Sequence, residues 1–271
     1  MATPRVRTSP WAALRGRAEL LRVQHPFAAQ QLRLYLALLD VWEDAWSRAR
    51  DVPPAELAGW AAREVFPAVL AATVAHGPKP LADSVSGADG EVAALLAAWL
   101  AGEGLEPTER YLARATLRGP LAAVDAGDAC AADPAPRGDR RCPHCAGPPQ
   151  LSVRLDSGDP LVAGRRELAC ARCAARWDYS GNACGFCGET GKRTMFAERD
   201  AAPRVGRGTP AGMFPHLRVE ACANCARYLI DIDLGRDPGA VPEVDELAAV
   251  PLDLFAAERG FSKITPNLMG F

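Results

Sequence analysis

Four short cysteine motifs in the second half of the chain decide its fold: Cys142-Pro143-His144-Cys145, Cys170-Ala171-Arg172-Cys173, Cys184-Gly185-Phe186-Cys187 and Cys222-Ala223-Asn224-Cys225. In each motif two residues separate the cysteines, and this spacing lets one tight turn point both sulfurs at the same ion. Two such turns brought together make a tetrahedral four-cysteine site. A single pair could instead be a redox dithiol, but four pairs within 84 residues predict metal binding.

The order of the motifs predicts which pairs share an ion. Sequential pairing gives a first site from Cys142, Cys145, Cys170 and Cys173, and a second from Cys184, Cys187, Cys222 and Cys225. A cross-braced arrangement, in which the first pair joins the third, stays open. Sequential pairing is favoured because its shorter loops cost less closure entropy. With four cysteines each, both sites are expected to be closed rather than catalytic.

The ligands leave the metal open between zinc and a mononuclear, rubredoxin-type iron, since four thiolates suit either ion. Four aromatic residues near the ligands are expected to shield the ions from water: Trp177, Tyr179, Phe186 and Tyr228. The ninth cysteine, Cys130, is expected to be an incidental thiol. His144 is expected to point outward, and Glu220 to be either a contact near the fourth motif or a solvated strand residue.

Charge argues against a general nucleic-acid binder. The 271-residue chain carries 31 basic and 33 acidic side chains, without the basic excess that such proteins show. Between residues 142 and 230 there are 12 basic and 8 acidic residues, a difference of +4. Two divalent ions, each held by four thiolates, would add −2 per site, about −4 in all, and bring this region close to neutral.

No N-terminal signal segment or membrane span is evident in the sequence. The longest apolar runs, such as Val92–Ala101, have about half the length that a span needs. We therefore expect a cytoplasmic protein that is not inserted in a membrane. In a reducing compartment, abundant cysteine usually indicates metal binding or catalysis rather than disulfides.

Periodicity predicts helices before residue 125. Leu32, Tyr35, Leu36, Leu39, Trp42 and Trp46 form one apolar stripe at helical spacing. A second helix is expected over 55–75 with a bend at Pro67, a third over 91–101, and a fourth over 107–117 that ends at Gly119-Pro120. Four amphipathic helices with short loops predict a bundle-like domain.

The composition changes after residue 125. Residues 126–141 lack periodicity and are interpreted as a linker, and short strands are expected over 150–155 and 167–169. The tail returns to helical spacing over 243–260, interrupted at Pro251. The predicted fold class is α+β, divided into a helical domain (1–125), a linker (126–141), two small metal-binding modules (142–183 and 184–240) and a helical tail (241–271).

A longer pattern surrounds the cysteine motifs. It includes Leu168 before the second motif, Trp177 after it, and Gly188 after the third. Its most specific part is Glu220-Ala221-Cys222-Ala223-Asn224-Cys225-Ala226-Arg227-Tyr228-Leu229, followed by Val244–Asp253 and Glu258-Arg259-Gly260-Phe261. In order and spacing, residues 140–271 resemble the formate dehydrogenase accessory protein FdhE family.

The resemblance implies a helical domain followed by two rubredoxin-like (zinc-ribbon-like) modules, with iron as the metal. It also implies a cytoplasmic, non-enzymatic factor that binds the catalytic subunit of a respiratory formate dehydrogenase during maturation. In that role the cysteines are structural or redox-sensing.

Two other functions stay open beside the accessory role. A rubredoxin-like electron carrier would need iron and reversible redox chemistry at both sites. A zinc-ribbon nucleic-acid-binding protein would need salt-dependent binding, which the charge balance disfavours.

Overall fold

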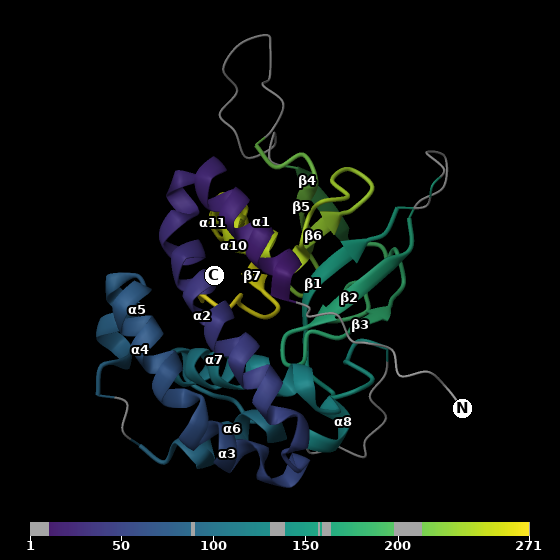
Figure 1. Ribbon diagram of the computed structural model, residues 1–271. Coiled ribbons are helices and arrows are strands. Elements are labelled where there is room, and N and C mark those ends of the chain that lie inside the picture. Colours follow the sequence, from purple (N-terminus) through teal and green to yellow (C-terminus); the bar gives the residue numbers. More distant parts are fainter. Residues whose placement is uncertain are drawn as a thin grey trace.

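The computed structural model describes residues 11–87, 90–130, 139–156, 158, 164–197 and 213–270. Its α-helices are α1 (Trp11–Gln24), α2 (Ala29–Arg48), α3 (Leu57–Glu64), α4 (Phe66–His76), α5 (Lys79–Val85), α6 (Val92–Ala101), α7 (Pro107–Ala123), α8 (Ala126–Ala129), α10 (Pro242–Ala248) and α11 (Val250–Glu258). The 3-10 turns are η1 (Pro26–Ala28), η2 (Ala49–Asp51) and η3 (Pro54–Glu56). The strands are β1 (Pro149–Arg154), β2 (Arg166–Cys170), β3 (Arg176–Asp178), β4 (Arg193–Ala197), β5 (Leu217–Cys222), β6 (Arg227–Asp233) and β7 (Ser262–Lys263). Figure 1 shows helices α1–α8 along one side and the sheet on the other, which confirms the predicted α+β class.

The helical half contains the predicted helices and two that were not predicted. The apolar stripe of α2 is buried as expected, with Trp42 1% exposed. The predicted bend near Pro67 is the break between α3 and α4, whose axes differ by 45°. The helices α1 and α5 were missed. In α1 the signal was present, because Trp11, Leu14, Ala18 and Leu21 are its buried residues and follow helical spacing.

The expected end of the fourth helix at Gly119-Pro120 is wrong, because α7 continues to Ala123 with Pro120 inside it. Gly119 is needed for packing instead. A Cβ there would lie 2.7 Å from the backbone oxygen of Trp42 and 2.9 Å from its Cα. The glycine therefore lets α2 and α7 approach closely, and their packing outweighs the local tendency of Gly-Pro to end a helix.

One sheet carries both cysteine modules. Its strand order is β3-β2-β1-β6-β5-β4, with β7 beside β6. Each module has the same plan: a cysteine turn, two antiparallel strands, a second cysteine turn and a third strand. The modules join where β1 pairs in parallel with β6. The predicted strands at 150–155 and 167–169 correspond to β1 and β2, whereas the residue limits of the modules and domains stay a prediction.

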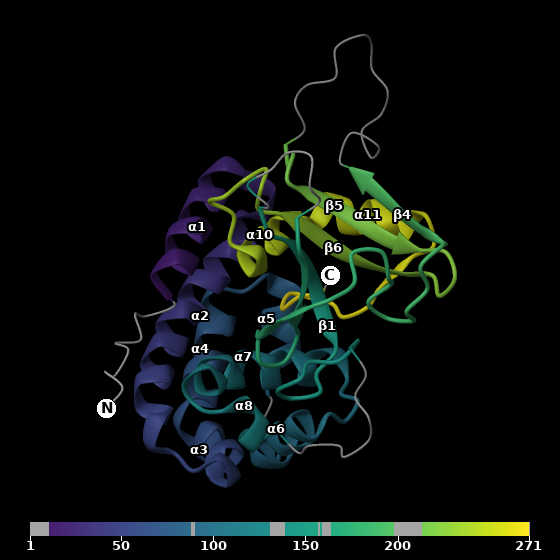
Figure 2. The same ribbon diagram turned by 90° about the vertical axis from the view of Figure 1, so that its right-hand side faces the viewer.

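The tail covers the sheet and closes the fold. α10 ends at Ala248 and α11 begins at Val250, so the expected interruption lies next to Pro251. Figure 2 shows α11 along β5 and β6, and α10 between α1 and the sheet. After α11, β7 adds a short parallel partner to β6. A single apolar core then runs from Trp11 on α1 to Ile232 on β6.

Part of the expected linker is folded. Ala126–Ala129 forms one helical turn, in which the Asp125 carboxylate accepts a 2.7 Å hydrogen bond from the Gly127 backbone. Residues 131–138 of this segment lie outside the described ranges.

Across the described ranges, no single helix is both long and apolar enough to cross a membrane. The bent pair Pro54–Glu64 and Phe66–His76 passes the same test of length and composition when its two parts are taken together.

Candidate metal centres

The first cluster lies between the sheet and the helices. Its sulfurs come from the turn before β1 (Cys142, Cys145) and from the turn that joins β2 to β3 (Cys170, Cys173). The Sγ–Sγ distances are 3.4 Å for Cys145–Cys170, 3.4 Å for Cys145–Cys173 and 3.6 Å for Cys142–Cys173. Sequential pairing thus brings these four sulfurs together.

The second cluster repeats this arrangement at the other module. Cys184 and Cys187 precede β4, Cys222 ends β5, and Cys225 lies in the turn before β6. The Sγ–Sγ distances are 3.8 Å for Cys184–Cys225 and 3.7 Å for Cys187–Cys222. The cross-braced alternative is therefore not the arrangement of the folded chain.

The spacing of the sulfurs fits a tetrahedral ion. A metal–sulfur bond of about 2.3 Å gives such a tetrahedron an edge of about 3.8 Å, and the measured separations lie between 3.4 and 3.8 Å. Disulfide sulfurs would be only about 2.05 Å apart. Each cluster could therefore hold one ion, and four thiolates suit zinc and iron alike.

All four cysteine turns end in the same backbone conformation. The residue after the second cysteine has a positive φ: 56° at Ala146, 59° at Ala174, 79° at Gly188 and 53° at Ala226. In three turns its N–H donates to the carbonyl of the first cysteine, at 2.9, 3.2 and 2.9 Å for the turns that begin at Cys142, Cys170 and Cys184. The left-handed residue reverses the chain, so that both sulfurs face one point.

Backbone groups also stabilise negative charge on the sulfurs. The N–H of Arg172 donates to Cys170 Sγ at 3.3 Å, and the N–H of Phe186 donates to Cys184 Sγ at 3.4 Å. Burial raises the pKa of Cys187, but hydrogen bonds from the Glu189 backbone and the Asn224 side chain outweigh it and lower this pKa to about 7. A lower thiol pKa favours the thiolate that a metal requires.

The two clusters differ in burial. In the first, Cys142, Cys145 and Cys170 are at most 4% exposed and Cys173 is half-buried. In the second, Cys184 and Cys222 are at most 3% exposed, whereas Cys187 and Cys225 are half-buried. The second cluster is therefore closer to solvent than the first.

The aromatic residues near the ligands have different roles. Trp177, Tyr179 and Tyr228 are at most 9% exposed, which agrees with a shielding role. Phe186 is 46% exposed, and the Arg227 guanidinium lies 5.4 Å from the centre of its ring. Phe186 therefore forms an apolar tip beside the second cluster rather than a buried shield.

Cys130, expected to be an incidental thiol, is buried. It is 3% exposed, and its interaction with Cys145 of the first cluster raises the pKa of Cys130. No sequence pattern predicts this contact, because Cys130 lies outside the motif spacing. His144 is exposed, as expected.

The structure decides between the two roles expected for Glu220. It is a contact, 4% exposed rather than solvated, and its Oε1 lies 2.6 Å from Arg166 Nη2 and 2.7 Å from Arg193 Nη2. Arg166 also donates to the backbone oxygens of Ser180 and Ala183, just before the third cysteine motif. This buried network connects the two modules.

A third group of residues whose side chains are common metal ligands forms a cluster of ion pairs. His216, Asp237 and Asp245 have ligand atoms within 4.8 Å of one another. The Arg17 guanidinium already occupies the space between the carboxylates, at 2.5 Å from Asp245 Oδ1 and 2.7 Å from Asp237 Oδ2. These residues connect α1 to α10 by ion pairs.

Comparison with known proteins gives three related findings. Residues 183–269 match the family model described as "FdhE, C-terminal domain". A protein FdhE homolog from Aquifex aeolicus is 32% identical over 130 residues, which is 48% of this chain and 41% of that protein. A protein FdhE homolog from Pseudomonas putida is 34% identical over 129 residues, which is 48% of this chain and 38% of that protein. The match thus spans about two fifths of the length of these relatives.

The fold agrees over a longer stretch. The crystal structure of the FdhE protein from Pseudomonas aeruginosa superposes with a TM-score of 0.62 and 23% identity, covering 96% of this chain and 94% of that one. At this identity the likeness concerns the fold, and at this coverage it includes the helical half. In sequence, the cysteine-containing part of this chain is similar to the C-terminal domain of FdhE proteins.

Proposed function

We propose that this protein is a non-enzymatic, cytoplasmic accessory factor that binds the catalytic subunit of a formate dehydrogenase and assists its assembly. The main support for this proposal is the pair of four-sulfur clusters on one sheet, in a chain whose motifs resemble those of the FdhE family. Four cysteines at each cluster leave no coordination position for a substrate, which favours a structural or sensing role.

In this proposal the eight clustered cysteines are the metal ligands, one ion to each cluster. Because ligand binding and folding of such small modules are coupled, each ion contributes directly to the stability of its module. The first cluster then holds the sheet against the helices. The second cluster, with Phe186 exposed beside it, is the part of the metal-binding half that a partner can reach.

Co-purification tests the partner. The tagged protein is co-expressed with the formate dehydrogenase catalytic subunit of its own organism, and the bound fraction is measured after affinity capture. We expect a complex with the unmodified chain and a weaker one with Phe186→Ala. Lys79→Gln on α5, whose side chain is 84% exposed, is the matched control and should bind normally. If the unmodified, metal-loaded chain captures no catalytic subunit, the accessory role is wrong.

A rubredoxin-like electron carrier is the second candidate, and the exposure of Cys187 and Cys225 favours it because electron transfer needs a site near the surface. Metal content and the visible spectrum of protein purified without oxygen separate the two functions. Two irons with reversible thiolate-to-iron absorption would support the carrier. Two zincs without colour would exclude it and leave the accessory role in place.

A further inference from the structure

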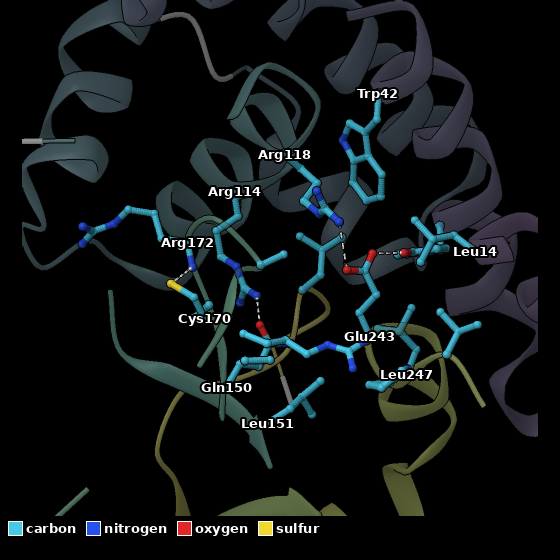
Figure 3. A pocket seen from close by; sticks show the side chains of 18 residues that line it. Leu14, Trp42, Arg114, Arg118, Gln150, Leu151, Cys170, Arg172, Glu243 and Leu247 are labelled. Carbon is cyan, nitrogen blue, oxygen red and sulfur yellow. Dashed lines mark hydrogen bonds and ion pairs between the residues drawn. The ribbon is translucent and has the colours of Figure 1, made fainter. Parts of the chain in front are cut away.

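A cavity of about 180 Å³ lies where the helical half meets the sheet. Its walls come from α1, α2 and α7 on one side and from β1, the turn after β2 and α10 on the other. Figure 3 shows Arg114 and Arg118 extending from α7 toward Gln150 and Glu243 across this space. The proposed partner surface makes no use of this cavity, and among the cluster cysteines Cys170 lines it.

Arg114 and Arg118 are one helical turn apart and share a face of α7. Like charges at this spacing repel each other, so the pair needs compensation. The charge of Arg118 is compensated, because its Nη2 lies 2.9 Å from Glu243 Oε2. Arg114 has no carboxylate partner among the described residues: its bonds go to the backbone oxygen of Pro266, at 2.7 Å, and to Oε1 of Gln150.

The surroundings of Arg114 penalise its charge. Desolvation lowers the pKa of Arg114 to about 10, and the nearby Glu246 only partly opposes this effect. Desolvation acts on Arg118 too, but there Glu243 outweighs it and the pKa is raised. A guanidinium has five N–H donors, and the two described bonds of Arg114 leave several without an acceptor among the described residues.

The other two arginines that line the cavity have partners of their own. In Figure 3 the guanidinium of Arg172 points away from Arg114, where it donates to the Cys145 carbonyl and lies over the Trp99 ring. Arg176 Nη1 lies 3.9 Å from Glu167 Oε2. Glu243 is the one carboxylate among the residues that line the cavity, beside the guanidinium groups of Arg114 and Arg118, while Glu246 and Cys170 partly offset the desolvation of Arg114.

We propose that this cavity binds a carboxylate group, held by the free N–H donors of Arg114 with Arg118 beside it. Arg114 has N–H donors left over from its two described bonds, and its planar guanidinium matches a carboxylate in two-point hydrogen bonding. The wall residues Leu14, Leu151 and Leu247 accommodate a short apolar body behind the carboxylate. The carboxylate can belong to a small free acid or to the end of a peptide chain, and both present the same chemistry.

Trp42 provides the measurement, because it lines the cavity and its indole N–H donates to the Ala115 carbonyl next to Arg114. The indole N–H resonance of Trp42, identified with Trp42→Phe, is followed by NMR during titration with sodium propionate at constant ionic strength. We expect a saturable shift, with an affinity of about 1–10 mM for so small a ligand. Propionamide, the neutral counterpart, should give none.

N-acetyl-leucine and N-acetyl-leucinamide form the second arm. If N-acetyl-leucine binds at least tenfold more tightly than propionate, the site is assigned to a chain terminus. If it binds equally or more weakly, the site is assigned to a small free acid. No saturable shift with either carboxylate, or an equal response to the amides, would overturn the proposal. This comparison uses the unmodified chain, so it does not depend on a variant that folds.

Two variants locate the site. Arg114→Gln should weaken propionate binding at least tenfold while the other indole resonances stay in place. Arg110→Gln is the matched control, since Arg110 lies one turn earlier on the same face but lines a separate cavity of about 110 Å³. The affinity of this variant for propionate should stay within twofold of that of the unmodified chain. Equal losses in both variants would show general electrostatic attraction and contradict the assignment to Arg114.

Discussion

At the residue scale, the four cysteine turns share one requirement, a residue in the left-handed region after the second cysteine. Three of these positions hold alanine and one holds glycine. An L-residue in this conformation pays about 1–2 kcal/mol that glycine does not. The motif spacing predicts the positions of the cysteines, but the left-handed backbone conformation and its free-energy cost follow only from the folded turns.

We therefore expect Ala226→Gly to raise the free energy of unfolding by about 0.5–1 kcal/mol, because relief of strain exceeds the entropy that glycine adds to the unfolded chain. Gly188→Ala should lower it by about 1 kcal/mol for the converse reason. Denaturant midpoints at a fixed metal concentration measure both. Ala68→Gly in the exposed face of α4 is the control and should destabilise by about 1 kcal/mol; a loss of the same size in Ala226→Gly would contradict the prediction.

The buried pair of Arg166 and Glu220 gives a second prediction at this scale. Arg166 is 2% exposed and Glu220 4%, so removal of one partner leaves the other charged and buried. Glu220→Ala should lower the free energy of unfolding by about 3–5 kcal/mol. Thermal unfolding followed by circular dichroism measures the loss. The exposed pair of Lys79 and Asp83 is the comparison, because Asp83→Ala should cost less than about 1 kcal/mol.

At the element scale, α1 is attached to α10 through charge. Asp245 is fully buried and accepts bonds from Arg17 and His216. Desolvation raises the pKa of Asp245, but His216 and Arg17 outweigh it, so the pKa in the folded protein lies below its ordinary value. The stabilisation by Asp245 is therefore complete above the ordinary carboxyl pKa of about 3.9 and is lost as the pH falls toward the lower, folded value.

Asp245→Asn should lower the free energy of unfolding by about 3 kcal/mol at neutral pH, because Arg17 loses its buried charge partner and keeps only the partly exposed Asp237. Its stability should also fall less steeply than that of the unmodified chain between about pH 5 and pH 3. Urea midpoints over this range measure both effects. Parallel pH profiles of the two proteins would show that Asp245 does not contribute.

The contact of α2 with α7 gives a further prediction at the element scale. Gly119→Ala would place its Cβ 2.7 Å from the Trp42 oxygen, so the helices must separate, at a cost of about 1–3 kcal/mol. Pro120→Ala should not lower stability, since it removes an unfavourable helix residue. Melting temperatures of the two variants decide between packing and helix termination. A destabilised Pro120→Ala beside a normal Gly119→Ala would reverse our interpretation.

At the scale of the whole molecule, the two clusters hold different parts of the structure. The first is buried against the helices, through Arg172 that lies over Trp99. The second has two half-buried cysteines, whereas the first has one, Cys173. We expect a chelator to remove the metal from the second cluster first, in two separate kinetic phases, because access limits release.

Serine variants assign these phases. Cys225→Ser should abolish the fast phase and leave the helical half folded. Cys170→Ser should abolish the slow phase and also loosen the helices, because it removes a ligand and the turn that carries Arg172. Metal-release kinetics and hydrogen exchange of α6 and α7 measure these effects. Release of both ions in one phase would show that burial does not separate the clusters.

The α+β class, the two groups of clustered cysteines and the family resemblance can all be predicted from the amino-acid sequence. This is possible because cysteine spacing and apolar periodicity are local properties of the chain. Three other features follow from tertiary packing: the modules share one sheet through β1 and β6, Cys130 interacts with the first cluster, and α7 continues beyond Pro120. The arginine cavity belongs to this second group as well, since Arg114, Gln150 and Glu243 meet only when the helices pack on the sheet. Such contacts join residues far apart in the chain, and their energies depend on burial and packing that no local pattern contains.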